Sequence, residues 1–161
     1  MIILIECLIL IIIFTLFVFY LAKDPIKTLY NYPPKVIKKV KSLKEYQDKI
    51  PTKNNQITSK LIVSLFIIII ISFILRYVNH YQTFLSSFKT SFLIFTIINI
   101  YDVIVLDLLW FCQSKKFIFK GTEDIKKEYK NYWFHIKEGL IGEVIGFIIC
   151  LFASLIVQFI L

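Results

Sequence analysis

The sequence predicts an all-α fold: an integral membrane bundle of four transmembrane helices, with a basic amphipathic interfacial helix in the first cytoplasmic loop. Two observations predict this class. Of the 161 residues, 58% are hydrophobic and only 19% are charged, whereas a soluble domain usually carries about a quarter charged residues. The apolar residues also gather in four long runs, and a chain this short cannot bury them all in a soluble core. The composition excludes an ordinary soluble domain, a disordered chain and a disulfide scaffold.

Each apolar run is long enough for one crossing, because about 20 helical residues cover the hydrocarbon core of a bilayer. Every crossing should be helical, since an open strand edge in lipid leaves backbone groups without hydrogen-bond partners. We expect the whole chain, 1–161, to form a single membrane domain. The predicted spans are residues 1–22, 61–78, 90–112 and 139–161, and the predicted cytoplasmic loops are residues 23–60 and 113–138.

Basic residues predict which side of the membrane each loop occupies. Ten of the nineteen Lys and Arg residues lie between Lys23 and Lys60, and seven more lie between Lys115 and Lys137. Loops rich in Lys and Arg stay in the cytoplasm, so both chain ends are expected outside. The formal charge of +8 is therefore interpreted as a topology signal. No nucleic-acid partner is predicted, because no domain is left over to bind one.

The first loop contains the predicted amphipathic helix. It opens at Pro33 and Pro34, whose rings preset φ for a helix start, and it ends at Pro51. Its apolar residues, at helical spacing, are Val36, Val40, Leu43 and Ile50. The lysines expected to face the anionic inner leaflet are Lys35, Lys38, Lys39, Lys41 and Lys44. Two interpretations stay open: specific recognition of anionic lipid, and a topology anchor that keeps the loop inside.

Four acidic residues fall inside predicted spans, where an ionisable side chain is costly and needs a partner or a purpose. They are Glu6, Asp102, Asp107 and Glu143. Glu6 is expected near the outer surface, in an outer-leaflet ion pair with Lys89 and Arg76. A proton-carrying glutamate is the alternative at this position.

The other three acids gather in the cytoplasmic half. Asp107 and Glu143 are predicted to form a carboxylate pair about 6–8 Å below the inner surface. Asp102 should lie about 7.5 Å deeper and about 140° around the helix, facing a different neighbour. His135 is expected at the mouth of the site, where an imidazole can shuttle protons or bind a metal, or else hold a loop at the interface. The candidate intramembrane polar site comprises Asn99, Asp102, Asp107, His135, Glu138 and Glu143.

Small residues recur along the fourth predicted span. They are Gly139, Gly142, Gly146, Cys150 and Ser154. Small side chains at this spacing let two helices approach closely, so we expect this stripe to pack against a neighbouring helix. The three cysteines show no CxxC spacing, and neither a redox pair nor a zinc site is predicted.

The stretch from Asp102 to Gly142 resembles a pattern found in small, uncharacterised four-span bacterial membrane proteins. The residues that carry the resemblance are Asp102, Asp107, Trp110, Gly121, Thr122, Glu123, Asp124, Tyr129, His135 and Gly139. The resemblance covers about a quarter of the chain. It implies a shared architecture, a site at the inner surface and a place in the bacterial cytoplasmic membrane. It implies no activity.

Three functions are compatible with these patterns. The first is proton- or cation-coupled transport by an oligomer, since four spans leave little room for a substrate path in a monomer. The second is a non-catalytic accessory or assembly subunit, in which the acids pair with loop lysines and the small-residue stripe docks a partner helix. The third is a metal-dependent enzyme acting on lipid headgroups, which the single arginine, Arg76, makes less favourable. The sequence leaves open whether the chain is an enzyme and whether it uses a cofactor.

Overall fold

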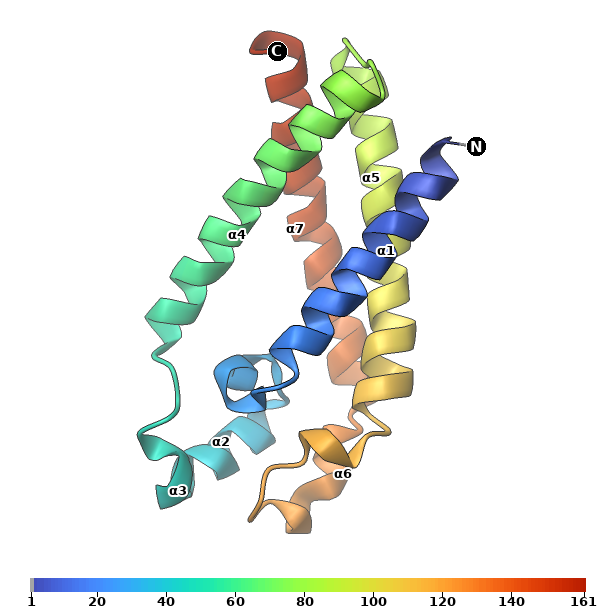
Figure 1. Ribbon diagram of the computed structural model, residues 1–161. Helices are drawn as coiled ribbons and strands as arrows, with labels where there is room; N and C mark the ends of the chain where they lie inside the picture. The colour runs from blue at the N-terminus through green and yellow to red at the C-terminus, as the bar shows by residue number, and fades with distance from the viewer. Residues whose placement is uncertain (1) are drawn as a thin grey trace.

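The computed structural model describes residues 2–161, which are helical with turns and contain no strand. Four long helices form a bundle (Figure 1): α1 (Ile2–Leu21), α4 (Lys53–Phe73), α5 (Phe84–Tyr101) and α7 (Tyr132–Phe159). Two of them continue as π-helices, α4 into η2 (Ile74–Val78) and α5 into η3 (Asp102–Phe111). All four are long and apolar enough to span a membrane. The predicted all-α class and the four long apolar helices are therefore confirmed.

Three of the long helices begin earlier than the predicted spans. Thr52, Thr83 and Asn131 precede α4, α5 and α7, and each side chain accepts a hydrogen bond from a backbone N–H of the first turn. Such an N-cap satisfies a donor that the helix itself leaves free. The helices therefore start in polar sequence, about two turns before the apolar runs. His135 and Glu138 consequently belong to α7, although both lie within the residues predicted as the loop 113–138.

α5 and α7 form the most extensive helix pair in the bundle, with α1 packed on α5 and α4 on α7. Glycines of α7 make the close approach possible. A Cβ added at Gly146 would overlap the ring of Phe95, and one added at Gly139 would overlap Val103. The backbone of α7 thus touches side chains of α5 and η3 directly, which is the packing that small residues allow.

α4 also packs on α7, at the C-terminal part of the small-residue stripe. Cys150 and Ser154 are fully buried, with 0% of each side chain exposed. Ser72 of α4 donates a hydrogen bond to the carbonyl of Ala153 at 3.2 Å. Small residues here bring a third helix close to α7, at the end of the bundle where both chain termini lie (Figure 1).

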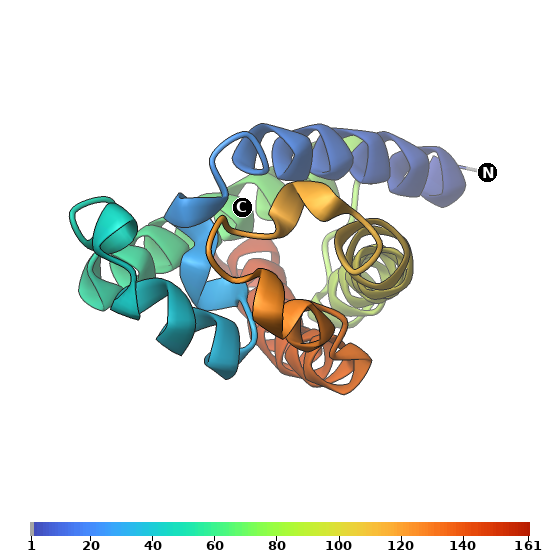
Figure 2. The same cartoon turned by 90° about the horizontal axis from the view of Figure 1, so that it is seen from below.

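The two segments predicted as cytoplasmic loops pack on each other at the opposite end of the bundle. We call residues 22–52 and 112–131 the loop layer; Figure 2 shows it from below, with both segments side by side. Its elements are η1 (Pro25–Asn31), α2 (Pro34–Ser42), α3 (Lys44–Gln47), η4 (Lys115–Phe117), η5 (Glu123–Ile125) and α6 (Lys126–Tyr129). Its buried core consists of Ala22, Ile26, Leu29, Tyr32, Val36, Val40, Phe117, Phe119 and Tyr129. The loops therefore form a folded layer with a hydrophobic core of its own.

The predicted amphipathic helix differs from the observed one in length and surroundings. Leu43 has extended backbone and separates α2 from α3, so no continuous helix reaches Pro51. Val36 and Val40 are fully buried among side chains of both loop segments. The apolar face of α2 therefore packs on protein, and the face that remains exposed carries lysines.

Two ion pairs join the loop segments at their surface. Lys35 Nζ lies 2.7 Å from Glu128 Oε1, and Lys39 Nζ lies 3.0 Å from Asp124 Oδ2. The hydrogen bond from the Lys39 ammonium holds the pKa of the Asp124 carboxyl below its usual value. Exposed pairs of this kind contribute little stability each, so the buried core, rather than these pairs, holds the layer together.

Candidate functional site

A row of polar side chains runs between α5–η3 and α7, from the loop layer into the bundle. We call this set the polar row; its members are Asp107, His135, Asp102, Asn99, Glu143 and Thr96. Five of the six belong to the candidate site predicted from the sequence. Thr96 was missed, although its spacing of three residues from Asn99 places it on the same helical face.

The π-helix η3 determines the direction in which Asp102 points. Backbone hydrogen bonds of a π-helix join residues five apart, and the Cys112 N–H donates to the Asp107 carbonyl at 2.9 Å. Residues five apart in a π-helix therefore lie near one face, so Asp102 and Asp107 share a side of η3. The expected separation of about 140° between the two aspartates assumed regular α-helical geometry, which η3 does not have.

His135 occupies the end of the polar row nearest the loop layer. Asn131 caps α7, so His135 lies one turn inside the helix, where its side chain is 3% exposed. Its Nδ1 lies 3.4 Å from Asp107 Oδ2, and its ring lies against that of Phe111, with 5.1 Å between the centroids. Its Nε2 is buried and has no hydrogen-bond partner within residues 2–161. One nitrogen thus faces a carboxylate, and the other has no partner in the described chain.

Glu143 is held further along α7 by two neutral donors of α5. Its Oε1 accepts a hydrogen bond from the Thr96 hydroxyl, and its Oε2 accepts one from Asn99 Nδ2 at 2.8 Å. Asn99 Nδ2 also donates to the Gly139 carbonyl at 3.0 Å, which fixes the amide against α7. A Cβ at Gly142 would lie 3.2 Å from Asn99 Oδ1, so a glycine there leaves room for the amide. Within the described residues, no cation forms an ion pair with Glu143.

The predicted carboxylate pair of Asp107 and Glu143 is not formed as a direct contact. Each acid has its own partners: Asp107 lies beside His135, whereas Glu143 is bonded by Asn99 and Thr96, which precede Asp107 by eight and eleven residues. Asp102 lies between the two hydrogen-bonded groups. Glu138 is exposed on α7 and lies outside the polar row. The structure therefore gives a sequence of polar groups at successive depths, instead of one cavity shared by all of them.

At the end of the bundle near the chain termini, Glu6 has a different partner from the one expected. Its Oε1 accepts a hydrogen bond from Asn79 Nδ2 at 2.7 Å, and both Glu6 Oε2 and Asn79 Oδ1 are buried without a partner in the described chain. Arg76 instead donates to the Tyr81 carbonyl at 3.5 Å, and Lys89 is exposed. Across residues 2–161, the outer-leaflet ion pair predicted for Glu6 is therefore absent.

Hydroxyl groups continue the polar character of α5 and α7 beyond Glu143. The buried ones are Ser87, Thr90, Ser91 and Ser154. Thr90 donates to the hydroxyl of Tyr81 at 3.1 Å, while Ser87 Oγ is buried and has no partner in the part of the chain described. Polar side chains consequently occur along α5 from the loop layer almost to its first turn.

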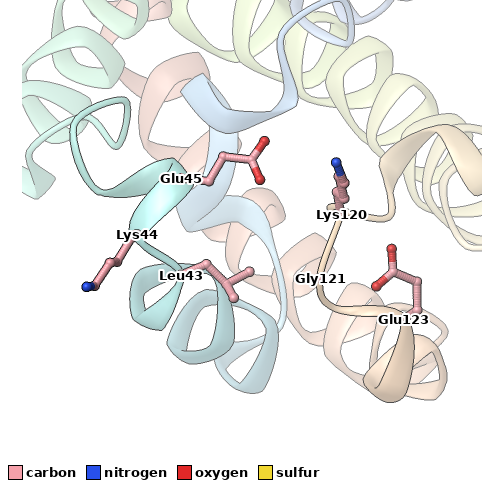
Figure 3. A pocket seen from close by; sticks show the side chains of 6 residues that line it. All are labelled: Leu43, Lys44, Glu45, Lys120, Gly121 and Glu123. Atoms are coloured by element: carbon pink, nitrogen blue, oxygen red, sulfur yellow. The ribbon is translucent and has the colours of Figure 1, made fainter.

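An open pocket of about 440 Å³ lies between the two loop segments (Figure 3). Gly121 forms its floor with a φ of +81°, a left-handed conformation that glycine adopts without strain. Leu43 points toward this turn, and a Cβ at Gly121 would lie 3.2 Å from its Cδ1. Lys120 and Glu123 carry opposite charges in this pocket, so it has no net preference for either sign of ligand.

Within residues 2–161, no group of three or more His, Cys, Asp or Glu side chains is arranged to hold a metal ion. Comparison of the chain with protein-family models, with curated proteins and with solved structures finds no match. The resemblance to four-span bacterial proteins therefore stays a prediction, and function has to be argued from the geometry of the polar row.

Proposed function

We propose that the chain is a multi-pass membrane protein that passes protons along the polar row, as a proton-coupled transporter with the loop layer in the cytoplasm. Four long helices with exposed apolar side chains support the membrane placement. The lysine-rich loop layer at one end and both termini at the other support the orientation. In this orientation, the exposed lysines of α2 face the anionic inner leaflet.

The proposal rests on the hydrogen-bond partners of the Glu143 carboxyl group. A carboxyl group inside an apolar span is costly, and such groups are typical of proton and ion pathways. A carboxylate kept for structure alone would be expected to have a lysine or arginine beside it. Glu143 instead receives its hydrogen bonds from the neutral Thr96 and Asn99. A carboxyl group between neutral donors is suited to gain and lose a proton.

The order of groups along the row suits stepwise transfer from the cytoplasmic side. His135 and Asp107 form the entrance, Asp102 lies one π-turn further in, and Glu143 lies deeper still. All four are titratable groups that exchange protons, and the buried hydroxyls beyond them can relay a proton. The arrangement of side chains suits a proton better than a metal cation, which needs several ligands at one point.

The accessory-subunit alternative expects the intramembrane acids to pair with loop lysines. The lysine ion pairs of the described chain use other acids, namely Asp24, Asp124 and Glu128, all in the loop layer. This distribution favours transport. Four spans leave little room for a substrate path in a monomer, so the transporter is proposed to act as an oligomer.

A flux measurement tests the proposal. The full chain is reconstituted into liposomes that contain a pH-sensitive dye, and a potassium diffusion potential drives protons inward. Wild type should acidify the lumen well above empty liposomes. Glu143→Gln should lower the rate by about tenfold or more, because an amide cannot carry the proton. Glu138→Gln is the matched control, since it removes an exposed acid of the same helix and should leave the rate unchanged.

Two results would overturn the proposal. A wild-type rate equal to that of empty liposomes would exclude autonomous proton transfer and favour the accessory subunit. Equal rates for wild type and Glu143→Gln would show that protons do not pass through this carboxyl group.

A further inference from the structure

A second pocket lies where the end of η3 meets η4 and α6, and it has a strong positive charge. Its volume is about 510 Å³. The charged residues that line it are Lys115, Lys126, Lys127, Lys130 and Glu123. Four positive charges thus surround a space that holds a single negative one. Its wall adjoins the polar row at Cys112, whose N–H donates to the Asp107 carbonyl, but none of its lysines belongs to α2 or to the polar row.

The four lysines have no carboxylate partners of their own. Within residues 2–161, none of them lies within ion-pair distance of an acid; most lysines of the loop layer are likewise unpaired, but these four line one pocket. Like charges held together repel one another, and the repulsion is relieved when an anion enters between them. The uncompensated charge therefore indicates a negatively charged ligand.

Buried contacts fix the walls of this pocket. The Tyr129 hydroxyl accepts a hydrogen bond from the Phe119 N–H at 3.2 Å and lies 2.7 Å from Thr122 Oγ1. The Cys112 thiol donates to the Tyr129 carbonyl at 3.5 Å, which ties α6 to the end of η3. The backbone of α6 is therefore held near the end of η3 by buried contacts, while the side chains of the four lysines are exposed.

The position of the pocket relative to the long helices shows which sources of anion can reach it. Gln113, in its wall, donates to the Tyr132 hydroxyl at 3.0 Å. Tyr132 and Trp133 begin α7 and are 45% and 71% exposed, and such aromatic residues gather at the depth of lipid headgroups. The pocket thus opens where both lipid phosphates and soluble phosphates are within reach.

We propose that this pocket binds a phosphate-bearing anion. Lysine ammonium groups bind phosphate as point charges, and the Ser114 hydroxyl in the wall supplies a neutral donor. A lipid headgroup and a soluble phosphate compound share this chemistry. The proposal does not rest on proton transfer, because none of the pocket lysines belongs to the polar row.

The first arm of the test uses pyrophosphate and the full chain in phosphatidylcholine nanodiscs. In a Trp133→Phe background, Trp110, which packs on Phe117 of η4 with 4.8 Å between ring centroids, reports binding by its fluorescence. The pocket variant changes Lys115, Lys126, Lys127 and Lys130 to Gln. The control variant changes Lys23, Lys49, Lys53 and Lys137 to Gln, removing the same charge from exposed positions outside both the pocket and the lysine face of α2. The pocket variant should bind about tenfold or more weakly, and the control within about twofold of wild type.

The second arm replaces pyrophosphate by brominated phosphatidylglycerol in the same nanodiscs, and quenching of tryptophan reports the lipid. Loss of saturable quenching in the pocket variant alone would identify a lipid headgroup as the ligand, whereas loss confined to pyrophosphate would identify a soluble phosphate. The double variant Lys126→Gln/Lys127→Gln, with two charges removed, should give an intermediate loss and guards against misfolding of the fourfold variant. Equal binding by wild type, pocket variant and control with both probes, or an equal loss in the control, would overturn the proposal.

Discussion

Replacing Gly146 by alanine should weaken the packing of α5 on α7. The added Cβ would overlap three atoms of the Phe95 ring, Cε1, Cδ1 and Cζ. The ring cannot keep its position, and both helices must shift or the ring must change its rotamer. Gly142→Ala is the matched control, because its Cβ would meet only Asn99 Oδ1, at 3.2 Å, where the amide needs to move by a few tenths of an ångström.

The size of the effect follows from two opposing terms. Overfilling a well-packed interface costs about 1–3 kcal/mol. Alanine in place of a helical glycine gains up to about 1 kcal/mol. Gly146→Ala should therefore lower the free energy of unfolding by about 1–2 kcal/mol, whereas Gly142→Ala should change it little because the two terms are closer in size.

Equilibrium unfolding in mixed detergent micelles, followed by near-ultraviolet circular dichroism, measures both variants. Phe95→Leu removes the ring atoms that the new Cβ would meet, so the double variant should recover part of the loss. A double-mutant cycle should give a coupling energy of about 1 kcal/mol or more between positions 95 and 146. Wild-type stability of Gly146→Ala, or additive effects of the two changes, would refute the close packing inferred here.

Three further predictions concern the loop layer. Tyr129→Phe should lower the unfolding free energy by about 1–3 kcal/mol, because the buried Phe119 N–H loses its acceptor; wild-type stability in chemical denaturation would contradict this. Tyr32→Phe should be neutral or stabilising in the same assay, because the Tyr32 hydroxyl is buried without a partner in the described chain. Lys39→Gln should raise the pKa of Asp124 toward its ordinary value, as followed by carboxyl NMR titration. Since Lys39 lowers the pKa of Asp124 in the folded chain, the ion pair stabilises the fold at pH values above the ordinary carboxyl pKa, and this stabilisation is lost as pH falls through the pKa of the folded state. An unchanged Asp124 pKa in the variant would exclude the ion pair in solution.

Composition was sufficient to predict the four long helices, because membrane-length apolar runs have few alternatives. It did not predict where those helices begin. Thr52 and Asn131 lie in polar sequence, and their capping side chains extend α4 and α7 beyond the apolar runs. An N-cap acts through one hydrogen bond to the backbone, so it leaves little trace in hydropathy.

The candidate site was predicted by residue type but not by pairing. Polar residues inside spans identified Asp102, Asp107, Glu143 and His135, since lipid makes each of them costly. The pairing depends on helix rotation, and the π-helix η3 rotates Asp102 toward the face of Asp107. Nothing in the residue pattern marks this change of backbone, because a π-helix is set by packing on the neighbouring helices as much as by local preference.

In the loop layer, too, the sequence predicted an apolar helix face but not the residues that pack against it. The helical spacing of Val36 and Val40 predicted one apolar face on α2, and both residues are buried. The residues that cover that face are Phe117, Phe119 and Tyr129, about 80 residues further along the chain. Periodicity reports which side of a helix is apolar, whereas its partner is decided by the tertiary fold.

The core of the loop layer combines residues from two distant segments, so it can be completed only late in the synthesis of the chain. Val36 and Val40 leave the ribosome before α4 is made, while Phe119 and Tyr129 follow only after α5 is complete. During that interval no part of the second segment exists to cover the first one. Contacts between such distant residues close late in folding. The loop layer therefore becomes resistant to proteases only after both halves of the chain have been translated, and a chain truncated before residue 117 should keep its first loop open to cleavage.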